Sequence, residues 1–128
     1  MTGPATRPAP KKAGPDLLVL ARMEEFTGWL LDRTAKWPKS ARFTLTQRIE
    51  NAALDVVEDL VAARYSRAGR RQRLDAVNLR LERLRHLFRL AKGARVCPFN
   101  VYESSIRSLD EVGRMLHGWR TSIGGKRT

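Results

Sequence analysis

At 128 residues the chain is long enough for one domain with a buried core but too short for two. Its 25 Lys and Arg residues against 13 Asp and Glu give a formal net charge of +12, which favours a polyanionic partner over a neutral substrate, unless the composition is simply biased toward arginine. The single cysteine, Cys97, excludes an internal disulfide and a cysteine-cluster zinc site, and no apolar run reaches the roughly 20 residues of a membrane span.

The chain is expected to begin with a disordered, basic, Pro- and Ala-rich tail, residues 1–15, which holds almost nothing to bury. A helical domain is predicted over residues 16–122, followed by a frayed C-terminal tail, residues 123–128. The first helix is predicted from Asp16, as N-cap, to Lys36. Its apolar residues recur at spacings typical of one helical face: Val19, Met23, Phe26 and Leu30.

The second helix is predicted from about Ser40 to Tyr65, with either Ser40 as its cap or a capping box of Thr44 and Gln47 one turn later. Its seam comprises Leu45, Ile49, Ala52, Val56, Leu60 and Ala63. Three further apolar residues widen this seam, and we therefore expect the second helix to be more buried than its neighbours: Leu54, Val57 and Val61.

The third helix, about Gly69 to Ala94, has an unbroken seam of residues spaced by three and four: Leu74, Val77, Leu81, Leu84, Phe88 and Ala91. The fourth is predicted from about Asn100 to Ser122, with alternative capping boxes at Asn100–Glu103 and Ser108–Glu111. Its stripe comprises Ile106, Leu109, Val112, Leu116 and Trp119. Because all connectors are short, the predicted fold is all-α, an up-down-up-down antiparallel four-helix bundle.

Basic residues crowd the third helix, where only Asp75 and Glu82 oppose them. A helical projection places Arg71, Arg85 and Arg89 on one side of the apolar seam and Arg73, Arg80 and Arg83 on the other. Arginine holds phosphate well, so this row is a candidate nucleic-acid surface, completed by Lys92 and Arg95. The alternative for each single arginine is a solvated residue or an ion pair with the acidic second helix.

A second group of cations stands where the second helix begins: Lys36, Lys39, Arg42 and Arg48. A helix N-terminus is already partly positive, so these side chains are poorly placed unless they hold an anion. In an antiparallel bundle this end should meet Arg89, Lys92 and Arg95. Trp37, Phe43 and Trp119 could stack on bases, although packing is favoured for Phe43 and Trp119.

Catalysis would need a carboxylate cluster or an acid–base pair. The sequence offers one candidate, in which Asp55 shares a helical face with Glu58 and with Asp59. A salt-bridge role is the stronger interpretation of these carboxylates. We therefore expect no enzymatic activity, no metal and no cofactor.

Three stretches in the order "WPKSARFTLTQRIENA" (37–52), "LRHLFRLAKG" (84–93) and "LDEVGRMLHGW" (109–119) resemble one four-helix family. It includes the ribosomal-RNA intervening-sequence proteins and the accessory variability determinant proteins of diversity-generating retroelements. The resemblance implies a homopentameric barrel of four-helix bundles. For the retroelement branch it also implies non-enzymatic binding of the reverse transcriptase and of nucleic acid during mutagenic copying of a template RNA.

The resemblance also assigns individual residues. Arg85 and Arg89, within "LRHLFRLA", match arginines that support partner binding in the retroelement branch. Gly113, which costs about 1 kcal/mol relative to alanine inside a helix, would be a close packing contact, against the alternative of simple tolerance. Two functions stay open: a retroelement accessory protein that binds reverse transcriptase, RNA and cDNA, and an RNA-binding protein of ribosomal-RNA insertions without a polymerase partner. Both imply a prokaryotic or phage-encoded, cytoplasmic protein.

Overall fold

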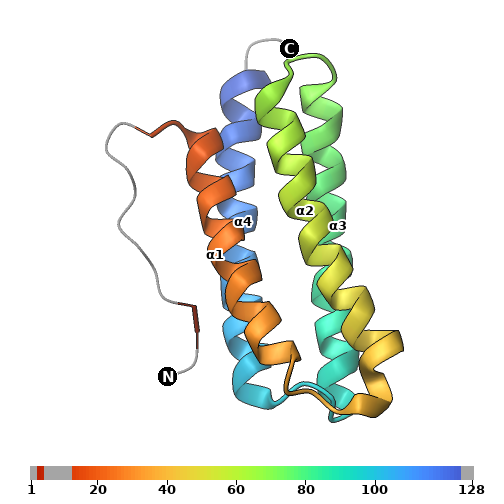
Figure 1. Ribbon diagram of the computed structural model, residues 1–128. Helices are drawn as coiled ribbons and strands as arrows, with labels where there is room; N and C mark the ends of the chain where they lie inside the picture. The colour runs from red at the N-terminus through yellow and green to blue at the C-terminus, as the bar shows by residue number, and fades with distance from the viewer. Residues whose placement is uncertain (1–2, 5–12, 125–128) are drawn as a thin grey trace.

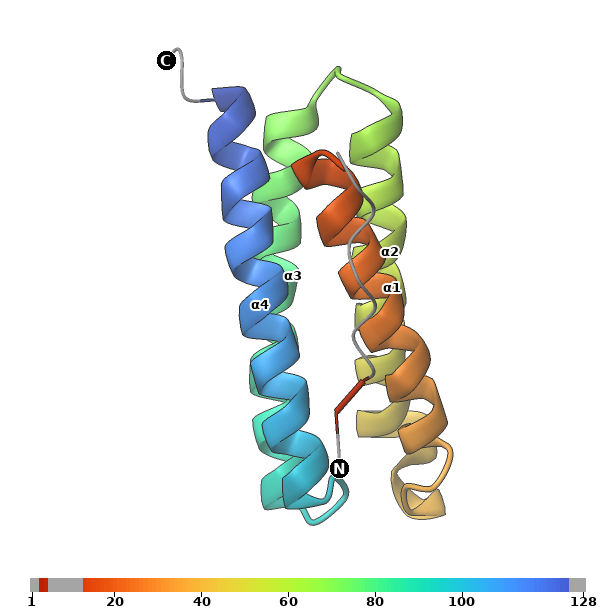
Figure 2. The same cartoon turned by 90° about the vertical axis from the view of Figure 1, so that its left-hand side faces the viewer.

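Four helices make up most of this computed structural model, which describes residues 3–4 and 13–124 (Figure 1). They are α1 (Pro15–Thr34), α2 (Gln47–Tyr65), α3 (Arg70–Gly93) and α4 (Phe99–Gly124). Each helix runs antiparallel to the next, and α4 packs against α1 to close the bundle (Figures 1 and 2). The predicted all-α, up-down-up-down four-helix bundle is confirmed.

The predicted tails, residues 1–15 and 123–128, fall mainly on residues 1–2, 5–12 and 125–128, which lie outside the described part of the chain. Within the described part, α1 begins at Pro15 and α4 continues to Gly124, so the helical domain is slightly longer than predicted. None of the described helices is both long and apolar enough to cross a membrane.

The core consists largely of the predicted seams, because side chains spaced by three and four residues share one helical face, but in α2 Ala53 rather than the predicted Ala52 is fully buried. The four apolar residues of α1 and all six of the α3 seam are buried. Phe88 of α3 lies at the centre of an aromatic cluster, with its ring edge-on to Phe26 and to Trp37 at centroid distances of 6.4 Å in both cases. This cluster joins α3 to α1 and to the connection that follows α1.

The α2 helix differs from its prediction. Ile49, Val56 and Leu60 are fully buried, but Leu54 is 39% exposed and Val61 is 48% exposed. These two residues lie outside the seam, on the surface that α2 turns away from the core. The prediction that α2 is more buried than its neighbours is therefore wrong.

Several predicted caps are also wrong. Gly14 is the N-cap of α1 and Pro15 occupies its first position, where proline's fixed φ is favourable, so Asp16 lies within the first turn. The α2 helix starts without a side-chain cap from Thr44 or Ser40, because a 3₁₀ turn and a π turn precede it. Asn100 lies inside the first turn of α4, which begins at Phe99, and Ser108 lies in its interior.

The two irregular turns before α2 are η1 (Lys39–Ala41) and η2 (Arg42–Thr46). They lie at the end of the bundle where α1 and α3 finish and α2 and α4 start, the lower end in Figure 1. We call this the lower end (residues 35–48 and 92–100), and the opposite end, with the α2–α3 connection, the upper end. The lower end holds most of the basic residues that the sequence assigned to an anion site.

Candidate nucleic-acid interface

Two arginines of α3 form ion pairs with neighbouring helices. Arg80 donates from Nε to Asp59 of α2 at 2.8 Å, and its Nη1 lies 3.5 Å from Asp55. Arg85 donates from Nε to Asp110 of α4 at 3.0 Å. The prediction that these arginines lie on opposite sides of the seam is confirmed, and the alternative of an ion pair with α2 holds for Arg80.

Arg85 makes further contacts that hold its guanidinium against α4. It donates to Glu82 at 3.0 Å and, more weakly, to the backbone oxygen of Leu109 at 3.4 Å. Its Nη2 lies 3.1 Å from the position that a Cβ atom would take on Gly113. The expected close contact at Gly113 is present, and its partner is the side chain of Arg85.

Two further candidates of α3, Arg73 and Lys92, have partly buried side chains. Arg73 is half-buried, and its Nε has no hydrogen-bond partner among the described residues. The ammonium of Lys92 lies 4.4 Å from the centre of the Tyr102 ring and 6.0 Å from that of Phe99, which are cation–π distances. Lys92 therefore faces the first turn of α4 while remaining at the surface.

Four other arginines of the α3 region have exposed side chains that form no hydrogen bond or ion pair with any described residue: Arg71, Arg83, Arg89 and Arg95. Arg95 has a φ of 61°, a left-handed conformation that glycine normally supplies after a helix. A non-glycine residue there costs roughly 1 kcal/mol. The strain at Arg95 marks a position where a cation is retained although glycine would suit the backbone better.

At the lower end, Lys39, Arg42 and Arg48 are all exposed, and none pairs with an acidic group in the described chain. The nearest acidic residue that follows in sequence is Glu50, whose carboxylate accepts a hydrogen bond from Thr34 of α1 instead. Among the described residues these three cations form no ion pair, and Arg42 and Glu50 line the same small hollow.

The predicted meeting of basic residues at the lower end is seen only in part, in a hollow of about 410 Å³ whose lining does not include Lys39, Arg42, Arg48 or Arg89. Lys36 lines it from the connection after α1, and Lys92 and Arg95 line it from the end of α3. Pro98 and Phe99, at the start of α4, complete the rim. Cations that are distant in sequence are thus adjacent where a helix begins.

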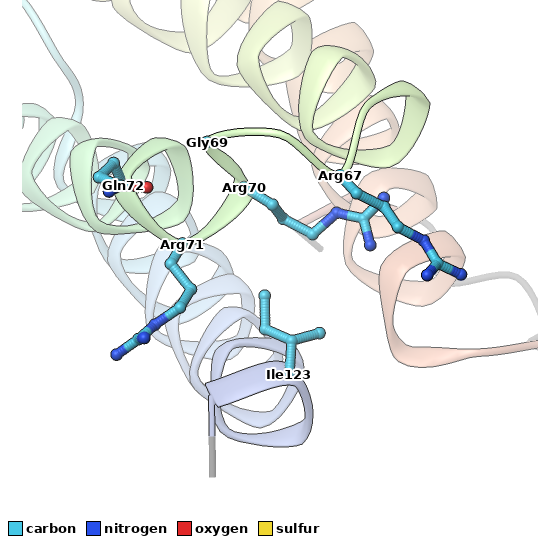
Figure 3. A pocket seen from close by; sticks show the side chains of 6 residues that line it. All are labelled: Arg67, Gly69, Arg70, Arg71, Gln72 and Ile123. Atoms are coloured by element: carbon cyan, nitrogen blue, oxygen red, sulfur yellow. The ribbon is translucent and has the colours of Figure 1, made fainter. Parts of the chain in front are cut away.

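The upper end carries a second basic hollow, of about 520 Å³, lined by Arg67, Arg70 and Arg71 with Ile123 of α4 (Figure 3). Figure 3 shows Arg67 and Arg70 extending in one direction and Arg71 in another. Arg71 is therefore far from the lower end, so the predicted site residues do not form one continuous surface.

Arg70 has a structural role that sequence reasoning missed. It donates to the backbone oxygens of Ala63 at 2.6 Å and of Arg64 at 3.1 Å, and its guanidinium lies 5.7 Å from the centre of the Trp119 ring. The last carbonyls of a helix lack partners within the helix, and Arg70 supplies donors to those of α2. Only the position of an arginine just after the α2–α3 connection could have signalled this.

The three aromatic candidates differ in burial, and one of them differs from the prediction. Trp119 and Trp37 are buried, at 3% and 6% exposure, so packing is their role. Phe43 is 79% exposed, and the prediction that it packs is wrong. The π turn carries Thr46 inward and leaves Phe43 in solvent, a result that regular helical spacing does not predict.

Two acidic residues of α2 form ion pairs, whereas no ion pair is seen for Glu58 among the described residues. Asp55 and Asp59 both approach Arg80, as the salt-bridge interpretation predicts. Within the described residues, no group of three or more His, Cys, Asp or Glu side chains is arranged to hold a metal ion.

Comparison with known proteins identifies one family. The family described as bAvd-like matches residues 17–123, which cover all four helices and the connections between them. No curated protein and no solved structure matches the chain. Since the match spans well over half of the sequence, the chain belongs to the bAvd-like family, as the resemblance to accessory variability determinant proteins implied.

Proposed function

We propose that this chain is a non-enzymatic accessory protein of a diversity-generating retroelement, which binds the reverse transcriptase together with template RNA or its cDNA. The family match supports the retroelement interpretation over that of ribosomal-RNA insertions. The observation that carries nucleic-acid binding is the set of exposed cations at the lower end that pair with no acidic group among the described residues. Such a set attracts a polyanion and releases its counterions.

The geometry divides the basic residues by role. Arg80 and Arg85 are neutralised by carboxylates, so they hold α3 against α2 and α4. Arg89 lies one turn beyond Arg85 and is exposed and unpaired among the described residues. We assign the direct contact with the polymerase to Arg89, and a positioning role to Arg85.

Nucleic acid binds, on this proposal, mainly at the lower end, through Lys39, Arg42 and Arg48 on one side and Lys92 and Arg95 on the other. Three further arginines contribute to the positive electrostatic potential along α3: Arg71, Arg73 and Arg83. The strain tolerated at Arg95 supports this assignment, because backbone strain persists where a side chain is needed for function.

Assembly into a homopentamer is part of the same proposal. Exposed apolar side chains on the outer surfaces of α1 and α2 support it, since they resemble an uncovered interface: Leu31, Leu54 and Val61. Light scattering should then give a mass of five chains of 14.6 kDa each. We place the assembly in the cytoplasm of a prokaryotic host, where the template RNA is transcribed.

The test is co-elution of the protein with the reverse transcriptase of the same retroelement. Arg89→Ala should weaken the complex without changing stability, because its side chain forms no hydrogen bond or ion pair within the described chain. Arg107→Ala is the matched control, because Arg107 is also exposed and unpaired there but lies on α4. Equal complex formation by wild type and Arg89→Ala would remove the assigned role, and no complex with wild type would overturn the proposed function.

A further inference from the structure

The turn that precedes α2 presents an aromatic ring to solvent. Phe43 is 79% exposed, whereas Ala41 and Thr46 on either side are each 5% exposed. These buried neighbours anchor the π turn, so the ring is held outward by a fixed backbone rather than by a loose loop. Short π segments recur at functional sites, where they redirect a side chain.

The residues next to this ring in the sequence include several exposed cations. Lys39, Arg42 and Arg48 are exposed beside it in the sequence, and no acidic residue lies between Asp32 and Glu50. A protein partner with an apolar surface would have to desolvate these three cations. A strand of nucleic acid would neutralise them with its phosphates and offer a flat base to the ring.

A second exposed aromatic ring, that of Phe99, lies at the same end of the bundle. Phe99 is 60% exposed at the rim of the hollow that Lys36, Lys92 and Arg95 line. The lower end therefore combines exposed aromatic rings with unpaired cations on both sides of the bundle. This combination is the one that proteins use to bind single strands, because stacking tolerates any base and the cations follow the backbone.

We propose that residues 39–48 form a contact for single-stranded nucleic acid, in which the Phe43 ring stacks on an unpaired base while Lys39, Arg42 and Arg48 bind the flanking phosphates. This inference rests on the proposed nucleic-acid binding and adds a preference for unpaired over duplex strands. In a duplex the base faces are already stacked on one another, so the ring gains nothing there.

The experiment measures fluorescence anisotropy of the full-length protein with two labelled probes, an unstructured single-stranded RNA and the same sequence as a blunt duplex. Phe43→Ala should weaken binding of the single strand about tenfold and leave duplex binding within twofold. Tyr65→Ala is the matched control, because Tyr65 is 92% exposed but lies at the upper end, and it should change neither. Arg42→Gln should weaken both probes, since phosphates are common to them.

A second variant adds a direct readout. Phe43→Trp should keep the single-strand affinity, and its exposed indole should be quenched by the single strand, whereas Tyr65→Trp should not be quenched. The inference is overturned if Phe43→Ala binds the single strand as wild type does, if it weakens both probes equally, or if it dissociates the oligomer by light scattering. Failure of wild type to bind either probe in dilute salt would instead overturn the proposed function itself.

Discussion

Replacing Gly113 with alanine should have different consequences with and without the side chain of Arg85. In a helix interior, glycine to alanine stabilises by about 1 kcal/mol. In the wild type the new methyl group would lie 3.1 Å from Nη2 of Arg85, so the guanidinium has to shift by a few tenths of an ångström, which disturbs its hydrogen bonds to Asp110 and Leu109. Partly exposed pairs of this kind are worth about 0.2–1 kcal/mol, so the helix gain is largely offset.

In an Arg85→Ala background nothing opposes the methyl group, and Gly113→Ala should stabilise by the full amount, about 1 kcal/mol. Arg85→Ala alone should destabilise by about 1 kcal/mol, since Asp110 and Glu82, which are themselves about half-exposed, each lose their ion-pair partner. Urea unfolding of the four proteins, followed by circular dichroism, gives the coupling free energy. We expect about 0.5–1 kcal/mol, which exceeds the few tenths typical of independent sites.

Gly118→Ala provides the control for this cycle. Gly118 lies in the same helix, but a Cβ atom there would have no neighbour within 4 Å. It should therefore stabilise by about 1 kcal/mol whether or not Arg85 is present. If Gly113→Ala were equally stabilising in both backgrounds, Arg85 would not rest on Gly113 and its positioning role would be refuted.

Three further predictions concern single groups. Burial raises the pKa of the Cys97 thiol to about 12. The thiol should therefore resist alkylation at pH 8 in the native protein and react fully in denaturant. Rapid labelling of the native protein would contradict the burial of Cys97. The Arg120 guanidinium holds the pKa of Asp75 below its ordinary value, so the folded state binds fewer protons than the unfolded state and loses stability as pH falls from about 5 to 3. In Asp75→Asn the urea midpoint should fall less steeply over this pH range than in the wild type. An equal fall in both proteins would show that the Asp75–Arg120 pair does not cause the pH dependence. Arg95→Gly should stabilise by about 1 kcal/mol in urea because glycine adopts the left-handed conformation freely, and yet weaken RNA binding; a less stable variant would show that the backbone there is unstrained.

Most of the fold could be predicted from periodicity. The α3 seam from Leu74 to Ala91 is buried as predicted, because residues spaced by three and four must share a face whatever the neighbouring helices are. The ends of the helices were harder to predict. The N-cap of α1 is Gly14 without a side-chain bond, so the usual capping residue Asp16 gave the wrong position.

The candidate site could be predicted only in part. That lower-end cations converge follows from antiparallel topology, and Lys36 does meet Lys92 and Arg95. Which arginines lack an ion pair does not follow from sequence, because Arg85 and Arg89 occupy similar positions in one motif, yet only Arg85 of the two pairs with Asp110 of α4 and with Glu82 of its own helix. The exposure of Phe43 depends on a π turn, for which the sequence carries no recognisable signal.

The salt dependence of template-RNA binding tests the central claim, that unpaired cations at the lower end hold a nucleic-acid backbone. The logarithm of the association constant should fall linearly with the logarithm of salt concentration, by about 0.7 per phosphate contact with a single strand. Replacing Lys39, Arg42 and Arg48 together with glutamine should reduce that slope by about 2, whereas Arg107→Gln with Arg114→Gln on α4 should leave it nearly unchanged. A slope that the lower-end variant does not alter, or no binding even in dilute salt, would contradict the claim.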